Sequence, residues 1–89
     1  MERYFSAQAD EEYRSWAKSE KKIFKKINDL IDDIEKNGFL SGIGKPEQLK
    51  YFKQPIYSRR IDRSNRLVYC QYNEDDLLII SCKGHYQDK

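Results

Sequence analysis

The chain has 89 residues, of which 38% are hydrophobic and 36% are charged. This length predicts one domain, spanning 1–89, with a modest hydrophobic core. No run approaches the roughly 18 consecutive apolar residues of a membrane-spanning helix, and the first residues lead into no signal-peptide core. We therefore expect a soluble, cytoplasmic protein without a membrane partner. Two cysteines and one histidine are too few for a disulfide scaffold or a zinc site, so we expect no metal and no cofactor.

Two helices are expected before residue 40. The first six residues are rich in aromatics and predict an edge strand, and either Ser6 or Asp10 can cap the helix that follows. Residues 10–19 carry apolar side chains at intervals of three and four, which is typical of a helix with one buried face. The same spacing is stronger over 20–36, where lysines and aspartates take the opposite side. Asn37-Gly38 predicts the end of that second helix.

The second half of the chain has the pattern of an antiparallel meander. A glycine-bracketed loop, SGIGKP at 41–46, leads into it. Three short segments rich in β-branched and aromatic residues then predict strands, separated by two polar turns. The strands are expected at 56–61, 66–72 and 77–83, and the turns at 62–65 and 73–76. Two helices followed by these strands predict the α+β class, with both helices packed on one face of a small antiparallel sheet.

The register of the last hairpin predicts which side chains meet at the end of the sheet. If residues 73–76 form a four-residue loop, counting outward from the turn fixes the pairs. The expected pairs are Tyr72 with Leu77, Cys70 with Ile79, Val68 with Ser81, and Arg66 with Lys83. Because side chains alternate between faces, Arg66, Lys83 and His85 are then expected on the same side. A register shift of one residue would separate them.

Both faces of this hairpin carry apolar residues, whereas two helices can cover only one face. The other face is therefore expected to meet a partner. Cys70 and Cys82 lie in these strands, and we expect them to be buried thiols in a reducing compartment.

Positive charge is concentrated in the middle of the chain. Up to Phe39 there are 8 Lys and Arg residues against 9 Asp and Glu residues, whereas 45–66 holds seven bases and two acids. The aromatic residues Tyr51, Phe52 and Tyr57 are interleaved with these bases. Such a segment suits single-stranded nucleic acid, which needs positive charge and flat stacking surfaces. A solvated basic face with ordinary core aromatics explains the same pattern.

Three residues are chemically suited to cleaving RNA without a metal. The reaction needs a base for the ribose 2′-hydroxyl, a cation for the charge that builds on the phosphorane, and an acid for the departing 5′ oxygen. Glu47, Arg66 and His85 fit these roles in that order. Each also has a simpler explanation: a carboxylate near a helix start or a lysine, a surface base, and a solvated histidine.

An ordered set of motifs carries a resemblance to a known family. The motifs are KKIFKKINDLIDDI, GKPEQLK at 44–50, YSRRI at 57–61, NRLVY at 65–69 and LLIISCKGHY at 77–86. Over about 4–86 the chain resembles the YoeB (Txe) family of toxins within the RelE superfamily. The resemblance implies the RelE-like fold and a bacterial toxin, an endoribonuclease that enters the A site of the 70S ribosome and cuts mRNA there. It also implies a cognate YefM-like antitoxin, often a homodimer, and contact with operator DNA only through the antitoxin complex.

The resemblance assigns roles residue by residue. The glutamate of the KPE motif falls on Glu47, as general base, and the arginine of RLVY falls on Arg66, which would stabilise the transition state. The closing HY falls on His85, as general acid, and on Tyr86, as a supporting or stacking group. The RNA-binding residues expected from the family and from the basic segment are Lys45, Lys50, Arg59 and Arg60.

The end of the chain departs from the family. Members often stop at the tyrosine of HY, whereas here Gln87-Asp88-Lys89 follows. Either this extension frays, or Asp88 folds back, pairs with Arg66 or Lys83 and raises the proton affinity of His85.

Two other functions compete with the nuclease. A toxin of the same fold that inhibits by binding, as the ParE branch does with gyrase, would lack the base, cation and acid. A non-catalytic nucleic-acid-binding or ribosome-binding inhibitor would keep the basic segment but would be indifferent to loss of His85.

Overall fold

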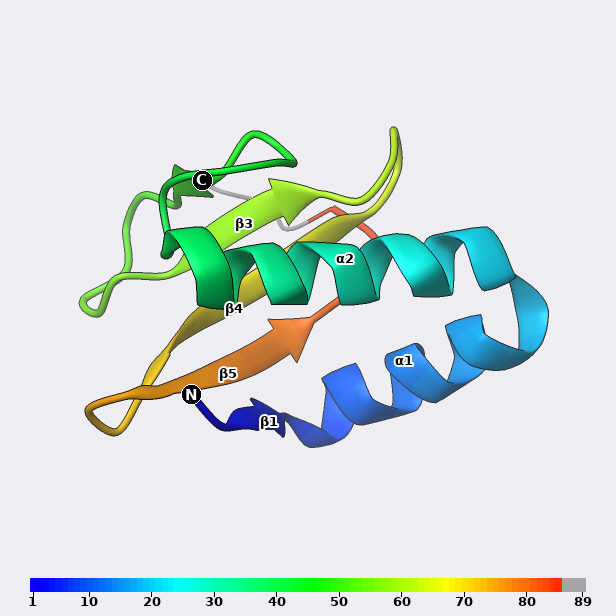
Figure 1. Ribbon diagram of the computed structural model, residues 1–89, viewed down its shortest axis with the longest axis horizontal. Helices are drawn as coiled ribbons and strands as arrows, with labels where there is room; N and C mark the ends of the chain where they lie inside the picture. Colours follow the sequence, from blue (N-terminus) through cyan, green and yellow to red (C-terminus); the bar gives the residue numbers. More distant parts are fainter. Residues whose placement is uncertain (86–89) are drawn as a thin grey trace.

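The protein is a two-layer structure of helices on a sheet. The computed structural model describes residues 1–85. Neither helix in this part of the chain is long and apolar enough to span a membrane. Two helices, α1 (Ala7–Ser19) and α2 (Lys21–Asn37), follow the first strand, and α2 crosses the sheet (Figure 1). The strands are β1 (Arg3–Phe5), β2 (Glu47–Gln48), β3 (Tyr57–Arg60), β4 (Arg66–Tyr72) and β5 (Asp76–Ser81).

Both helices have the ends that the sequence predicts. Ser6 caps α1, because its hydroxyl oxygen accepts a hydrogen bond from the Ala9 backbone N–H at 3.0 Å. Helix α2 ends at Gly38, which has a φ of 96° and donates its backbone N–H to Ile34 O. The buried stripe of α2 repeats at three and four residues and consists of Ile27, Leu30, Ile31 and Ile34.

The sheet is mixed, with strand order β1-β5-β4-β3-β2. The edge strand expected in the first six residues is confirmed as β1, and it runs parallel to β5, whereas the other pairs of the sheet are antiparallel as predicted. A parallel partner that lies more than 70 residues away leaves no turn signal in the sequence. Arg3 joins this edge to α2, since it forms ion pairs with Glu35 at 2.8 Å and with Asp32.

The hairpin of β4 and β5 has a different register from the one predicted. Its loop has three residues, so that Tyr72 pairs with Asp76 and Cys70 pairs with Leu78. A β-bulge next to Val68 then restores the predicted pair of Val68 with Ser81. Between the loop and the bulge, Leu77 and Ile79 each pair with the residue of β4 that precedes their predicted partner, because the loop is one residue shorter than predicted.

The core lies between the sheet and the helices. It is formed by Ile27, Leu30, Ile31 and Ile34 of α2 against Leu67, Tyr69, Leu77 and Ile79 of the sheet. Val68 and Cys70 on the opposite face are also buried, at 1% and 9% exposure, so the uncovered apolar face is smaller than predicted. What remains exposed there includes Tyr4 and Tyr72, whose rings lie 5.1 Å apart. Cys70 and Cys82 are buried free thiols, as predicted.

Candidate functional site

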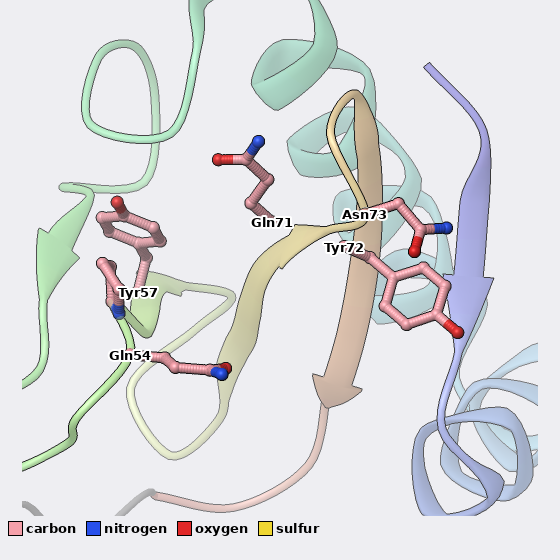
Figure 2. A pocket seen from close by; sticks show the side chains of 6 residues that line it. Gln54, Tyr57, Gln71, Tyr72 and Asn73 are labelled. Carbon is pink, nitrogen blue, oxygen red and sulfur yellow. The ribbon is translucent and has the colours of Figure 1, made fainter.

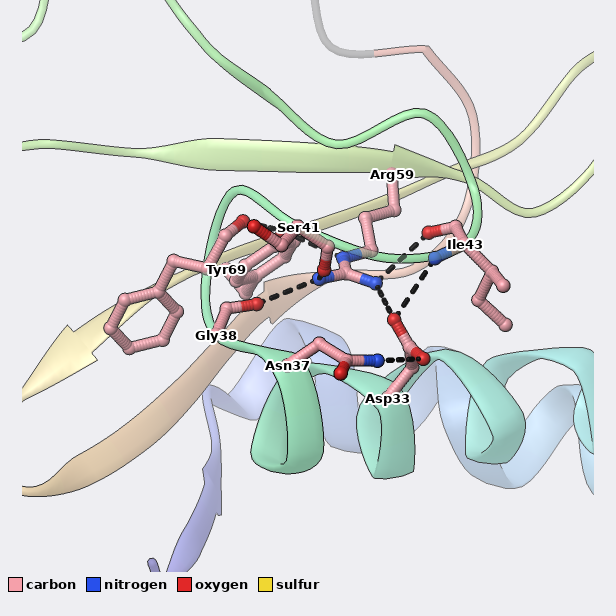
Figure 3. A network of polar contacts seen from close by, with 8 residues as sticks. Asp33, Asn37, Gly38, Ser41, Ile43, Arg59 and Tyr69 are labelled. Atoms are coloured by element: carbon pink, nitrogen blue, oxygen red, sulfur yellow. Dashed lines mark hydrogen bonds and ion pairs between the residues drawn. The ribbon is translucent and has the colours of Figure 1, made fainter.

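Arg59 is the most completely bonded polar side chain described. Its side chain is 0% exposed, and all five of its N–H donors have acceptors. The acceptors are Tyr69 Oη at 2.9 Å, Asp33 Oδ2 at 2.6 Å, Ile43 O at 2.9 Å, Gly38 O at 2.8 Å and Ser41 O at 2.7 Å (Figure 3). The prediction that Arg59 binds RNA phosphates is therefore wrong, because this guanidinium has neither a free donor nor an exposed surface.

The network around Arg59 shapes the loop that follows α2. Asp33 also accepts hydrogen bonds from the Ile43 backbone N–H and from the Asn37 amide. The hydrogen bond from Arg59 lowers the pKa of the Asp33 carboxyl below its ordinary value, and burial raises the pKa of Tyr69. Gly42 completes the enclosure: its φ is 114°, and a Cβ atom there would lie 1.8 Å from Asp33 Oδ2. The glycines of SGIGKP thus pack a loop around one arginine.

This loop leads to Glu47, which begins the edge strand β2. Gly44 O accepts a hydrogen bond from the Arg60 backbone N–H at 2.7 Å, which fixes the approach to β2. Glu47 then pairs with Ser58 of β3, and Ser58 pairs with Val68 of β4. The two-residue strand β2 was not predicted, since the sequence suggested either a loop or a helix start there. The Glu47 side chain is exposed.

Arg66 lies on the same face of the sheet as Glu47. Because side chains alternate along a strand, Arg66 shares a face with Val68, two residues along β4, and Val68 is in the row of Glu47. Two strand spacings and two residues separate the Cα atoms, which corresponds to about 10 Å across the strands and about 7 Å along them. Arg66 is half-buried, and its Nη1 donates a hydrogen bond to Asp62 O at 3.4 Å.

The segment after β5 brings His85 next to Arg66. The Arg66 backbone N–H donates to Gly84 O at 3.0 Å, and the Gly84 N–H donates to Asn65 Oδ1 at 2.7 Å. His85 is exposed, with Nε2 3.1 Å from Arg63 O. The backbone of Arg66 therefore lies next to the backbone that leads into His85, as expected.

The predicted pairing of Arg66 with Lys83 is wrong, because Gly84 takes that place. Lys83 instead places its ammonium 5.7 Å from the centre of the Trp16 ring on α1, away from the side predicted for it. Tyr86 and the extension Gln87-Asp88-Lys89 lie outside the described residues.

A basic depression of about 530 Å³ lies at the end of the sheet beside Arg66. Its lining comes from α2, from the end of the glycine loop and from the β3–β4 turn. Five of the eight lining residues are cations and one is an acid. The lining residues are Lys26, Gly44, Lys45, Arg60, Ile61, Asp62, Arg63 and Arg66. Lys45, Arg60 and Arg66 are thus brought together, whereas neither Glu47 nor His85 lines the depression.

A second depression, of about 520 Å³, lies at the opposite end of β3 and β4 and has no charged lining. Figure 2 shows Gln54 and Tyr57 on one side of it and Gln71 on the neighbouring strand. The Gln71 amide already donates to Glu74 O at 2.6 Å. The remaining predicted RNA-binding residue, Lys50, is exposed and precedes Tyr51, which is 78% exposed in a left-handed conformation with φ 69°. These residues form the tip between β2 and β3 rather than part of either depression.

Comparison with known proteins identifies the family. The model of the YoeB-like toxin of bacterial type II toxin–antitoxin systems matches residues 5–86. The chain belongs to the YoeB family of toxins. Toxin YoeB of Streptomyces coelicolor is 44% identical over 82 residues, which cover 92% of this chain and 95% of that protein. Two structures from Staphylococcus aureus are each 46% identical and cover 97% of this chain and 98% of theirs: a YoeB dimer with a TM-score of 0.89 and a heterotetrameric YoeB–YefM complex with a TM-score of 0.87.

Membership of the YoeB family confirms the resemblance and the α+β class predicted from the sequence. The sequence interpretation missed Lys26 and Arg63 in the basic depression. In the sequence, Lys26 belongs to the polar side of the second predicted helix, and only the packing of α2 beside the β3–β4 turn brings it to the depression. The burial of Arg59 had a detectable signal, since adjacent residues of a strand face opposite sides and the two arginines of YSRRI cannot both face a ligand on one side.

Proposed function

We propose that this toxin is an mRNA endoribonuclease that acts in the A site of the ribosome by acid–base catalysis. Glu47 takes the proton of the ribose 2′-hydroxyl, and the 2′ oxygen attacks the adjacent phosphorus. Arg66 stabilises the negative charge that builds on the phosphorane, and His85 donates a proton to the leaving 5′ oxygen. Tyr86 supports or stacks at the same site, and Lys45, Lys50 and Arg60 bind phosphates of the mRNA or of ribosomal RNA.

The observation that supports this proposal is the convergence of three chemically different groups from separate segments. Glu47 and Arg66 lie on one sheet face, and His85 follows the residue that is hydrogen-bonded to Arg66. An exposed carboxylate and an exposed imidazole on either side of an arginine provide a base, a cation and an acid. The neighbouring concentration of positive charge favours a polyanionic substrate.

The cognate partner that we propose is a YefM-like antitoxin, since a YoeB relative from Staphylococcus aureus forms a complex with YefM. Another structure of that relative is a dimer, and we propose a homodimer for this toxin as well. The antitoxin inhibits the toxin by occupying or distorting the catalytic end, and operator DNA is contacted only through the complex.

The test is cleavage of mRNA on programmed ribosomes at saturating toxin. We expect Glu47→Gln, Arg66→Ala and His85→Gln each to lower the single-turnover rate by about 10²-fold or more, by analogy with the loss of one oxyanion donor. Glu74→Gln is the matched control, because Glu74 is also an exposed glutamate but lies in the β4–β5 turn, and it should cut like the parent. If all three variants kept the parental rate, the acid–base assignment would be wrong.

A binding-only inhibitor of the ribosome or of nucleic acid is the second candidate. It is favoured by one observation: the basic depression is lined by Arg66 but not by Glu47 or His85. Growth arrest with intact mRNA, unchanged in the His85→Gln variant, would identify this mode.

A further inference from the structure

The basic depression holds positive charge that the described part of the molecule does not neutralise. Lys26, Lys45, Arg60, Arg63 and Arg66 line it, and within residues 1–85 none of them forms an ion pair. Elsewhere in the same range, Arg3, Arg14, Lys25 and Arg59 are all paired with carboxylates. Single unpaired lysines also lie elsewhere on the described surface, but the depression gathers five such cations around one acid.

The single acid of the depression is already occupied by its own turn. Asp62 Oδ1 accepts hydrogen bonds from the backbone N–H groups of Ser64 at 2.8 Å and Asn65 at 2.9 Å. The Asn65 amide donates to both Asp62 oxygens. This carboxylate thus stabilises the β3–β4 turn and is held away from the role of a counter-ion for the five cations.

Two of the cations lie side by side on neighbouring strands of the sheet. Arg60 and Arg66 are register partners on β3 and β4, and directly opposed residues have Cβ atoms about 4.5–5.5 Å apart. Like charges directly opposite each other on neighbouring strands are destabilising. An anion that lies between such groups turns repulsion into attraction. The pair thereby favours a ligand with more than one negative charge.

The floor of the depression is rigid. Ile61 is only 6% exposed and belongs to the core, and Gly44 has a φ of 82°. A Cβ atom at Gly44 would lie 2.7 Å from Leu30 Cδ2 and 3.3 Å from Arg60 O, so the backbone passes where no side chain fits. The cations consequently project from three fixed segments: α2, the end of the glycine loop, and the β3–β4 hairpin.

We propose that Lys26 and Arg63 are phosphate-binding residues, and that the depression holds successive phosphates of the RNA strand next to the phosphate held by Arg66. This role rests on the ribosome-dependent nuclease function proposed above and extends the RNA path from the sheet onto helix α2. Because five of the eight lining residues are cations, the lining suits the charged phosphate oxygens of a nucleic-acid backbone. A volume of about 530 Å³ is within the range of about 300–1,000 Å³ that ligand sites occupy.

The experiment measures binding of the toxin to mRNA-programmed ribosomes at a series of salt concentrations. A His85→Gln background keeps the mRNA intact during the measurement. Each of Lys26→Gln and Arg63→Gln should lower the slope of log affinity against log salt by about 0.7–0.9, the value for one phosphate contact. Lys22→Gln is the matched control, since Lys22 is an exposed lysine of α2 outside the depression, and it should keep the parental slope.

A second measurement separates this site from the nuclease function. A short single-stranded DNA oligonucleotide, which has no 2′-hydroxyl to attack, is titrated into the toxin and followed by side-chain NMR signals. Shifts at Lys26 and Arg63 that exceed the shift at Lys22 support the phosphate site, whether or not the wild-type toxin cleaves mRNA. If wild-type toxin cleaves mRNA but the salt slopes of both variants equal that of Lys22→Gln, the phosphate site is refuted while the nuclease stands. If instead both variants weaken only the binding of the antitoxin, the depression serves that partner and the RNA assignment is overturned.

Discussion

The burial of Arg59 next to the exposure of Arg60 makes a sharp prediction about stability. Removing one partner of a buried ion pair costs about 3–5 kcal/mol, because the remaining polar groups lose their partner without regaining water. We expect a loss of this size in Arg59→Met, which leaves a carboxylate, a tyrosine hydroxyl and three backbone carbonyls without their donor. Arg59→Lys keeps the charge but has three donors for five acceptors, so about 1–3 kcal/mol of destabilisation is expected.

These losses are large for a chain of this size. At about 0.05–0.15 kcal/mol per residue, the whole domain is stable by about 4–13 kcal/mol. A loss of 3 kcal/mol would lower the unfolding temperature by about 12–24 °C, at about 4–8 °C per kcal/mol for a small domain. Arg60→Met is the matched control, because this neighbour is exposed and forms no ion pair within the described residues, and it should change stability by less than about 0.5 kcal/mol.

The assay is urea unfolding followed by circular dichroism, in a Glu47→Gln background that removes the toxicity expected of the active protein. Glu47 is exposed, so this background substitution should leave the folded state unchanged. Equal midpoints for Arg59→Met and Arg60→Met would refute the structural role of Arg59, as would an Arg59→Lys variant with parental stability.

Three further predictions concern the same fold. The pKa of Asp33 lies below its ordinary value of 3.8, so near pH 3–4 the unfolded chain binds more protons than the folded protein. The free energy of unfolding should therefore rise with pH through that window and fall on acidification. Arg59→Met should flatten this pH dependence in unfolding curves measured from pH 2.5 to 6. Gly42→Ala should destabilise the protein by about 1–3 kcal/mol more than Gly38→Ala. Both positions have positive φ, but only the new Cβ atom at residue 42 meets the Asp33 carboxylate. Equal losses of stability in thermal unfolding of the two variants would contradict this prediction. Burial raises the pKa of Cys82 to about 12, so this thiol should resist alkylation at pH 8 and react only at the rate of global unfolding. Mass spectrometry of timed iodoacetamide reactions can measure that rate. Rapid alkylation of Cys82 in the folded protein would contradict this prediction.

The features that sequence predicted well are those set by local patterns. The helical spacing of apolar residues and the Asn37-Gly38 stop predicted α2 nearly to the residue, and the apolar and aromatic residues at 66–72 predicted the bounds of β4. The failures are non-local. The parallel pairing of β1 depends on a partner more than 70 residues away, and the two-residue strand β2 and the bulge beside Val68 depend on how neighbouring strands pair. None of these leaves a periodic signal in the sequence.

The candidate site divides in the same way. Residue chemistry and family motifs singled out Glu47, Arg66 and His85, but neither gives the direction of a side chain. The direction of the side chain is what makes the predictions for Arg59 and Lys83 wrong. The Arg59 side chain points into the core, and the Lys83 ammonium lies over the Trp16 ring. Lys26 shows the converse, because a helix position that looks like ordinary solvated surface becomes part of a binding site only when another segment packs beside it.

The two arginines of YSRRI connect stability to the site by a short physical route. Arg59 faces α2 and holds the carbonyls of Gly38, Ser41 and Ile43, whereas the backbone N–H of Arg60 holds Gly44 O. The loop is thus fixed from both sides of one strand just before it reaches β2 and Glu47. Because an ordered loop costs conformational entropy for every residue that it fixes, this loop keeps one shape only while the arginine satisfies its carbonyls. Charge buried at residue 59 therefore holds the geometry of the exposed charges at 45, 47 and 60, which explains why adjacent arginines on one strand serve such different purposes.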